Sequence, residues 1–327
     1  MDFRTIVPVQ KGAPKIEHGK GVFLIGSCFV ENIGAKLDWF KFRNRQNPTG
    51  IIFHPSPIRR FFQRLSNNEN YSDRDLIEFN DGWQSLEAHS DMRRESREEC
   101  LKDLNTSLEN SREFFAGASH VIISLGTAWG YIYEGTTDIV ANCHKIPQKR
   151  FRKELSSVDE IINDLEVISH SVSQMNEEAK IIFTISPVRH LKDGVVENQQ
   201  SKAHLTTALH EFLGNNDSAV YFPSYEIMMD ELRDYRFYAE DMLHPSKVAV
   251  DYIWKLFSYN WISSKSLELN LEIDKIQKAL SHRSRAENTT EHKKFLTKIQ
   301  VKIEEIQKNH PEITFSQALL LLGLSIF

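Results

Sequence analysis

Three side chains that together can activate a hydroxyl group stand at two distant places in the chain. Ser27 follows a short apolar run at residues 22–25, while Asp241 and His244 form an Asp-x-x-His motif far downstream. A serine hydroxyl becomes a nucleophile when a base takes its proton, and a carboxylate holds that base in the required tautomer. We therefore interpret Ser27 as a candidate nucleophile, His244 as its general base and Asp241 as the orienting acid.

The residues around Ser27 are typical of a strand-to-helix turn. Residues 22–25 suit a buried strand, and residues 30–40 repeat apolar side chains on one helical face. Gly26 permits a tight bend that other residues resist. The first turn of the helix offers unpaired backbone N–H groups, which can stabilise the oxyanion formed during acyl transfer.

Each motif also has a purely structural interpretation. Ser27 is a favoured helix N-cap. Asp241 or Ser246 can equally cap a helix at residues 248–257. Taken alone, neither motif identifies an enzyme, but their joint occurrence in the chain order nucleophile, acid, base favours the catalytic interpretation.

The two motifs resemble the SGNH hydrolase superfamily, which places its nucleophilic serine after the first strand and an Asp-x-x-His before the closing helix. The closer resemblance is to the GSCFA family, whose motif here reads Gly26-Ser27-Cys28-Phe29-Val30, with Val30 in place of alanine. Four further segments look like stretches of that family, and the resemblance covers residues 1–260. They are NPTGIIF at 47–53, SLGTAW at 124–129, VANCHK at 140–145 and TISPVRH at 184–190.

This resemblance implies a metal-independent serine esterase that acts through Ser27, His244 and Asp241, needs no cofactor and cleaves small acyl esters. By family analogy alone, the favoured substrate is a small acyl group such as acetyl on a carbohydrate or another alcohol. Two alternatives stay open. One is an acyltransferase that uses the same triad, and the other is a noncatalytic ligand-binding module.

One position departs from the superfamily, in which an Asn three residues after a Gly completes the oxyanion hole. Counting from Gly126 reaches Trp129 instead. Asn142 or the region of Thr127 is expected to replace that donor, and the backbone N–H of Gly50 is a further candidate.

Other reactive side chains suggest different chemistry. Cys28 raises the alternative of a cysteine hydrolase, because a helix N-terminus stabilises a thiolate. We favour Ser27, since cysteine is often buried and adjacent side chains on a tight turn point apart. A metal site is disfavoured because the histidines lack metal-ligand spacing. His144 and His190 are candidates for the cleft wall and for substrate binding, although a buried His144 bonded to backbone explains its motif equally well.

Composition excludes several classes of protein. The 327 residues include 45 acidic and 40 basic side chains, a net charge of -5, which argues against a nucleic-acid-binding surface. Three cysteines form neither a metal pattern nor an even disulfide set. The N-terminus has no secretory pattern, and the apolar segment at residues 318–327 is too short to span a bilayer. We expect a cytoplasmic protein with no membrane partner, and the oligomeric state is left open.

The order of the elements predicts an α/β fold. Apolar runs predict strands at residues 21–25, 121–125, 181–185 and 219–222, and helical patterns alternate with them at residues 57–65, 97–115, 158–175 and 201–213. Such alternation is typical of right-handed crossovers over a parallel sheet. We expect a three-layer α/β/α SGNH-hydrolase-like domain over residues 1–260. Ligands of such folds bind beyond the carboxyl ends of the strands, where Ser27, Gly126 and Ser186 fall.

After residue 260 the pattern changes to two polar amphipathic helices, at residues 267–282 and 291–309, with a charged segment between them. We expect residues 261–327 to form a C-terminal helical hairpin or extension. Its second helix carries an apolar stripe that needs a partner surface. We favour packing within the chain over dimerisation. The stripe consists of Leu296, Ile299, Ile303 and Ile306.

Overall fold

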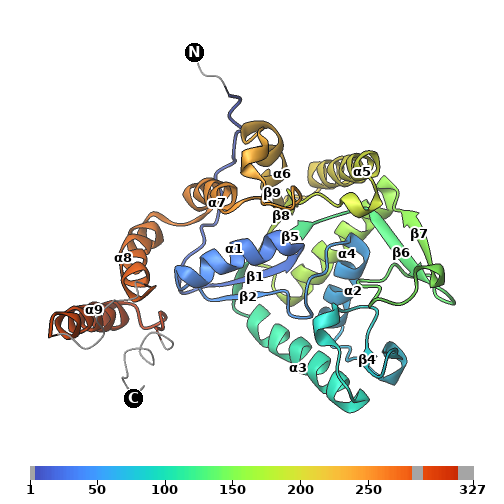
Figure 1. The fold of residues 1–327 in the computed structure, drawn as a ribbon, viewed down its shortest axis with the longest axis horizontal. Coiled ribbons are helices and arrows are strands. Elements are labelled where there is room, and N and C mark those ends of the chain that lie inside the picture. Colours follow the sequence, from blue (N-terminus) through green and yellow to red (C-terminus); the bar gives the residue numbers. More distant parts are fainter. Residues whose placement is uncertain (1–3, 282–289, 316–327) are drawn as a thin grey trace.

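A five-stranded parallel sheet lies at the centre of the computed structural model, which describes residues 4–281 and 290–315 (Figure 1). Its strand order is β2-β1-β5-β8-β9, and every neighbouring pair is parallel. The carboxyl ends of all these strands therefore meet at one edge. The strands are β1 (Gly21–Gly26), β2 (Asn44–Gln46), β5 (Ala118–Leu125), β8 (Lys180–Ile185) and β9 (Ala219–Tyr221).

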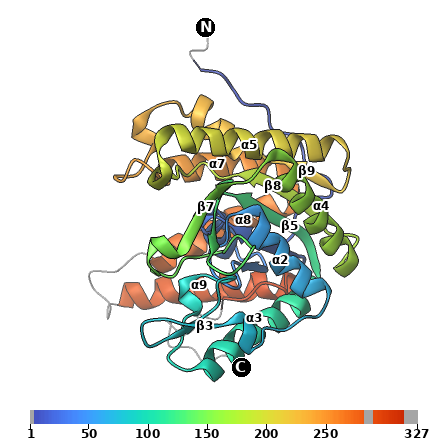
Figure 2. The same ribbon diagram turned by 90° about the vertical axis from the view of Figure 1, so that its right-hand side faces the viewer.

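Helices cover both faces of this sheet (Figures 1 and 2). One face carries α1 (Cys28–Trp39) and α7 (Lys247–Trp261), and the other carries α2 (Pro55–Ser66), α3 (Arg97–Phe115), α4 (Val158–Met175) and α5 (Val195–Gly214). Alternate residues of β1 divide between the two cores. Val22 and Leu24 pack with α1 and α7, whereas Phe23 and Ile25 pack on the other side. The predicted three-layer α/β/α fold is confirmed.

The sequence predicted α3 and α4 with the bounds that the structure shows, because a serine caps each helix. Ser96 Oγ accepts the backbone N–H of Glu99 at 3.2 Å, and Ser157 forms a capping box with Glu160. α5 begins at Val195, well before the predicted start at residue 201.

Several short elements had no signal in the sequence. β2 contains only polar residues, and two small antiparallel pairs lie outside the central sheet. These pairs are β3 (Ile77–Glu78) with β4 (Trp83–Gln84), and β6 (Trp129–Tyr133) with β7 (Phe151–Leu155). A short helix, α6 (Ser224–Glu226), follows β9 and continues into a π-helical turn.

Two helices follow the α/β region, α8 (Ser264–Ser281) and α9 (Thr290–Asn309). They lie at the end of the molecule opposite the β6–β7 pair (Figure 1). Their apolar side chains form a separate cluster that includes Ile299, Ile303 and Ile306, so these three residues of the predicted stripe pack within the chain. Leu296, the fourth, is only partly buried and lies outside the cluster. Hydrogen bonds from Trp39 Nε1 to Asp274 and from Gln277 to the carbonyl of Trp39 attach α8 to the end of α1.

The segment between α8 and α9 and the apolar segment at residues 318–327 lie outside the described residues. In the part of the chain that is described, no helix combines the length and the apolar character needed to cross a membrane.

Candidate active site

The segments that the sequence singled out meet at the carboxyl edge of the central sheet. Gly26 ends β1 and is followed by Ser27, Gly126 follows β5, and Ser186 follows β8. The loop before α7 reaches the same edge, because the N–H of Arg189 donates to the carbonyl oxygen of Leu243 at 3.1 Å. Folding therefore brings the Asp-x-x-His motif to the edge that carries the turn after β1.

Gly26 makes the turn after β1 possible. Its φ is +144°, and a Cβ at this position would lie 2.2 Å from the carbonyl oxygen of Ser124. The side-chain oxygen of Asn47 accepts the N–H of Gly26 at 3.0 Å, and the N–H of Ser27 donates to Ser124 O at 3.0 Å. The turn is thus fixed from both neighbouring strands.

Ser27 is fully buried at this turn and caps α1. Its Oγ lies 3.0 Å from Ser124 Oγ and accepts the N–H of Phe29 at 3.3 Å. Among the described residues, no hydrogen bond joins Ser27 to His244. The assignment of Ser27 as the nucleophile stays a prediction.

Cys28 is the first residue of α1, and its side chain is partly exposed. Burial and the charge of Glu31 raise the pKa of the Cys28 thiol, whereas Lys202 and the backbone N–H groups of Cys28 and Phe29 lower it. Burial is the largest of these effects and raises the pKa of the Cys28 thiol. The resting thiol therefore carries its proton.

Asp241 and His244 form a hydrogen-bonded pair. His244 Nδ1 donates to Asp241 Oδ2 at 2.6 Å, while Asp241 Oδ1 accepts the N–H groups of Leu243 at 2.9 Å and His244 at 3.0 Å. The N–H of His244, that of Leu243 and the imidazole lower the pKa of Asp241 to about 2. Met242, between them, has a φ of +59°, which bends the loop enough for one carboxylate to reach all three donors.

The capping interpretation of this motif holds for Ser246 and not for Asp241. Ser246 is the N-cap of α7, and its Oγ accepts the N–H of Ala249 at 3.4 Å. The backbone holds the loop through bonds from Ala239 N to His244 O and from Ser246 N to Phe237 O. Asp241 is consequently left to orient the imidazole.

The first half of α5 supports the loops after β5 and β8. Lys202 is buried, and its ammonium donates to the carbonyl oxygens of Gly126 and Ser186, each at 2.7 Å. One turn earlier, Asn198 accepts the N–H of His190 at 2.9 Å. Burial lowers the pKa of Lys202 to about 7. The sequence placed this lysine near the cleft, but its burial was not predicted, since nothing in its local pattern signals it.

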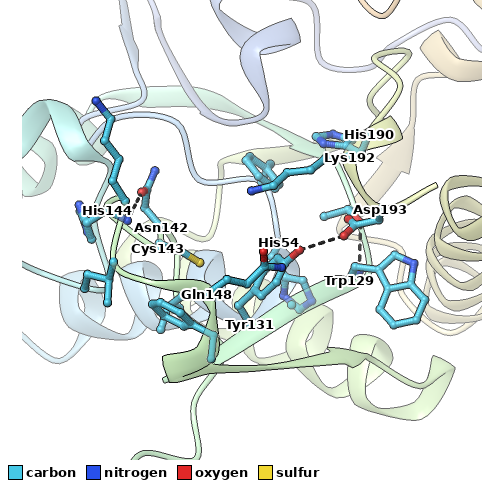
Figure 3. A pocket seen from close by; sticks show the side chains of 18 residues that line it. His54, Trp129, Tyr131, Asn142, Cys143, His144, Gln148, His190, Lys192 and Asp193 are labelled. Carbon is cyan, nitrogen blue, oxygen red and sulfur yellow. Dashed lines mark hydrogen bonds between the residues drawn. The ribbon is translucent and has the colours of Figure 1, made fainter. Parts of the chain in front are cut away.

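A cavity of about 370 Å³ adjoins this edge (Figure 3). Four of the predicted binding residues line it, namely Thr127, Asn142, His144 and His190. Figure 3 shows Asn142 and His144 on one side of the cavity, facing His190 and Asp193 on the other. Aromatic side chains complete the wall, at Phe53, Trp129, Tyr131 and Phe151.

His190 belongs to this wall and comes from the loop after β8. Its Nε2 is buried without a hydrogen-bond partner among the described residues, and a Cβ on Gly126 would lie 3.0 Å from it. Burial, with the nearby charges of Lys202 and His244, lowers the pKa of His190 to about 3. The imidazole is therefore neutral, lines the cavity and lies close enough to His244 to interact with it electrostatically.

Each predicted oxyanion residue takes part in a hydrogen bond, which for Asn142 involves the acceptor oxygen and not the donating Nδ2. The N–H of Gly50 donates to Asn47 O at 2.8 Å, and Asn142 Oδ1 accepts the N–H of His144 at 2.8 Å. Thr127 Oγ1 lies 2.9 Å from Ser201 Oγ. None of these observations tests the predicted role of Asn142, Gly50 or Thr127 in catalysis.

His144 is buried, and its Nε2 donates to the carbonyl oxygen of Ser85 at 2.7 Å. Its backbone φ is +50°. Burial lowers the pKa of this imidazole. A backbone-bonded histidine, the structural alternative for this motif, is thus present at the cavity wall. In the described part of the chain, no group of three or more His, Cys, Asp or Glu residues is arranged to hold a metal ion.

Comparison with protein families gives two matches. The model described as GSCFA family matches residues 21–257, and the model described as GSCFA domain protein, C-terminal domain, matches residues 273–323. A search of the curated proteins finds no match.

Two solved structures are distantly similar. One is a carbohydrate esterase family 3 from Talaromyces cellulolyticus, with 9% sequence identity, coverage of 77% of this chain and 99% of that chain, and a TM-score of 0.36. The other is an acetyl esterase mutant with an acetate ion, with 10% identity, coverage of 78% and 99%, and a TM-score of 0.36. At these values neither likeness bears on activity.

Proposed function

The chain belongs to the GSCFA family, and from this membership we propose that it is an acyl-ester hydrolase in which His244, oriented by Asp241, is the general base. The observation that carries the proposal is the 2.6 Å hydrogen bond between His244 Nδ1 and Asp241 Oδ2. With the proton held on Nδ1, Nε2 is left to accept a proton from a nucleophile and to return it to the leaving alcohol.

The charge of Asp241 supports this role. With its pKa lowered to about 2, the carboxylate stays ionised at neutral pH and stabilises the imidazolium that forms when His244 takes a proton. Both side chains of the pair are close to half exposed, so substrate can reach the ring without a large movement.

The carboxyl edge of the sheet provides the other two groups that ester hydrolysis needs, a nucleophile and hydrogen-bond donors for the oxyanion. The turn at residues 26–28 presents two candidate nucleophiles at the start of α1, and the first-turn N–H groups of a helix suit the oxyanion of a tetrahedral intermediate. The mechanism needs no metal and no cofactor.

The cavity supports a small acyl ester of a carbohydrate or another alcohol as the substrate. Aromatic faces at Trp129 and Tyr131 can pack on a sugar ring, and Asn142, Gln148 and Asp193 can bind its hydroxyl groups. Asp193 is already held by Tyr131 and Lys153, at 2.9 and 2.7 Å, so its carboxylate is fixed in place.

The experiment is a panel of esters with short and long acyl groups, including an acetylated sugar, assayed with the wild type and with two variants. His244→Ala is expected to lower kcat/KM by about 10³-fold or more, and Asp241→Asn by about 10²- to 10⁴-fold. His310→Ala is the matched control, because His310 also pairs with a carboxylate, Glu312, but lies beyond α9. If His244→Ala and Asp241→Asn turned over the esters as fast as the wild type and the control, His244 could not be the base.

A further inference from the structure

Two adjacent side chains compete for the role of nucleophile, and the structure treats them differently. Ser27 is fully buried, and its Oγ is engaged with Ser124 Oγ and with the N–H of Phe29. An attacking atom must come within about 3–3.5 Å of the acyl carbon. A substrate can reach Ser27 Oγ only if the turn opens and the cap of α1 is lost.

Cys28 is more accessible than Ser27. It is the first residue of α1, and although it packs against the core beneath α1 and α7 it remains partly exposed. A negative charge on this sulfur is favoured by the N-terminus of α1. The N–H of Cys28, at the start of the same helix, suits the oxyanion of an acyl group attached to the sulfur.

Lys202, which is buried against the loops after β5 and β8, is a second group that a negative charge on Cys28 would favour. Its side chain is 2% exposed, and two of its protons are donated to the carbonyl oxygens of Gly126 and Ser186. Among the described residues, no carboxylate lies within ion-pair distance of it, and Cys28 is the titratable group whose negative charge would favour the ammonium. Burial lowers the pKa of Lys202 to about 7, so a negative charge that forms on Cys28 during a reaction would favour its charged form.

We propose that the Cys28 thiol, and not the Ser27 hydroxyl, attacks the acyl carbon, with Lys202 stabilising the negative charge and Ser27 holding the turn. This inference rests on the function proposed above, because His244 remains the base.

The reaction balances as follows. His244 Nε2 takes the proton of the Cys28 thiol while the sulfur forms a bond to the acyl carbon, and the carbonyl electron pair moves to oxygen. When that pair returns, the ester C–O bond breaks and the leaving alkoxide takes the proton from His244. Water then attacks the thioester, again giving a proton to His244. The C–S bond breaks, and the thiolate recovers the proton as the carboxylic acid leaves.

The state of the resting thiol agrees with this sequence of steps. Burial keeps Cys28 protonated, so the thiolate must be generated by a base as the substrate is attacked. The proposed mechanism therefore depends on His244. It differs from a mechanism in which Cys28 is already a thiolate at rest, in an ion pair with Lys202.

The first test traps the acyl-enzyme. The full chain is mixed with 4-nitrophenyl acetate, quenched in acid and mapped by mass spectrometry. The expected result is an acetyl group on Cys28 that neutral hydroxylamine removes, as for a thioester. Ser27→Ala is expected to keep this adduct while melting at a lower temperature, and Cys28→Ala to lose it together with at least about 100-fold in turnover. An acetyl group on Ser27 that persists in Cys28→Ala would overturn the proposal.

The second test does not require an ester. Iodoacetamide is applied at neutral pH, and the alkylation rates of Cys28 and of Cys143, which is also partly exposed, are compared in the same sample. Burial raises the pKa of both thiols, so a difference in rate would report the removal of the Cys28 proton by His244 during the attack. On that basis Cys28 is expected to react at least about tenfold faster, and Lys202→Met and His244→Asn to remove most of that difference. Equal rates in the wild type would overturn the proposal. Fast, His244-dependent alkylation without turnover of any ester would support the thiol nucleophile and refute the ester substrate. Circular dichroism of Lys202→Met and Cys28→Ala distinguishes loss of folding from loss of reactivity.

Discussion

A methyl group on Gly126 would lie 3.0 Å from Nε2 of His190 and 2.9 Å from Cβ of Phe53, so the backbone after β5 and the imidazole are in direct contact. His190 Nε2, which has no hydrogen-bond partner among the described residues, therefore lies against the loop after β5. In that loop the carbonyl oxygen of Gly126 accepts a hydrogen bond from the Lys202 ammonium. The position of His190 relative to the strand edge therefore depends on the absence of a side chain at position 126.

Gly126→Ala is expected to push His190 and Phe53 away from the loop. We expect a loss of about 1–3 kcal/mol of stability from overpacking and a lower kcat/KM for ester hydrolysis. Gly214→Ala is the matched control, since a Cβ at that position meets no atom within 4 Å, and it should stay within about 0.5 kcal/mol of the wild type. Chemical denaturation and ester assays measure both effects. A Gly126→Ala protein with unchanged stability and activity would show that the contact is not tight.

Acid is expected to destabilise the fold through its buried histidines. Burial lowers the pKa of His18, His54 and His120 to about 4 and that of His190 to about 3, from 6.5. Below pH 6.5 the unfolded chain binds protons that the folded chain does not accept until about pH 4. The free energy of unfolding therefore decreases as the pH falls through this window, by up to about 1.4 kcal/mol per pH unit for each histidine.

Urea denaturation at a series of pH values between 7 and 4.5 measures this slope. His120→Gln is expected to reduce it, because this imidazole is buried and bonded to the carbonyl of Pro14. His170→Gln, at an exposed position of α4, is the control and should leave the slope unchanged. A slope of zero in the wild type would contradict the linkage.

The cluster between α8 and α9 is expected to respond to mutation separately from the sheet. Ile303 is fully buried in that cluster, whose members all come from residues 269–315. Ile303→Ala should cost about 2–5 kcal/mol of local packing. Hydrogen exchange should then accelerate in α8 and α9 while the amides of β1 and β5 stay protected. Val301→Ala, at an exposed position of α9, is the control. Equal acceleration in β1 would show that the two parts unfold as one unit, and the predicted boundary at residue 260 would lose its support.

The sequence contained enough information for four of the five strands of the sheet and for the helices that follow a strong cap. Runs such as residues 181–185 are almost entirely apolar, and Ser157 with Glu160 marks a helix start that depends on neighbouring residues alone. β2 could not be predicted, because its three polar residues form a strand only by pairing with β1. The β6–β7 pair was missed for a similar reason, since its two strands are separated by a long loop.

The site was predicted unevenly. The Asp241–His244 geometry follows from short-range spacing, which the sequence displays directly. The burial of Ser27 depends on Ser124, a residue of the neighbouring strand, and the burial of Lys202 depends on how α5 crosses the ends of β5 and β8. Such long-range packing determines whether a side chain is reachable, and no local motif encodes it.

The two edge strands of the central sheet, β2 and β9, are only three residues long, whereas its inner strands have six to eight. An edge strand this short exposes few unpaired backbone groups to a strand of another molecule. The tapering of the sheet therefore limits the growth of intermolecular β-structure, and it does so without depending on any particular side chain.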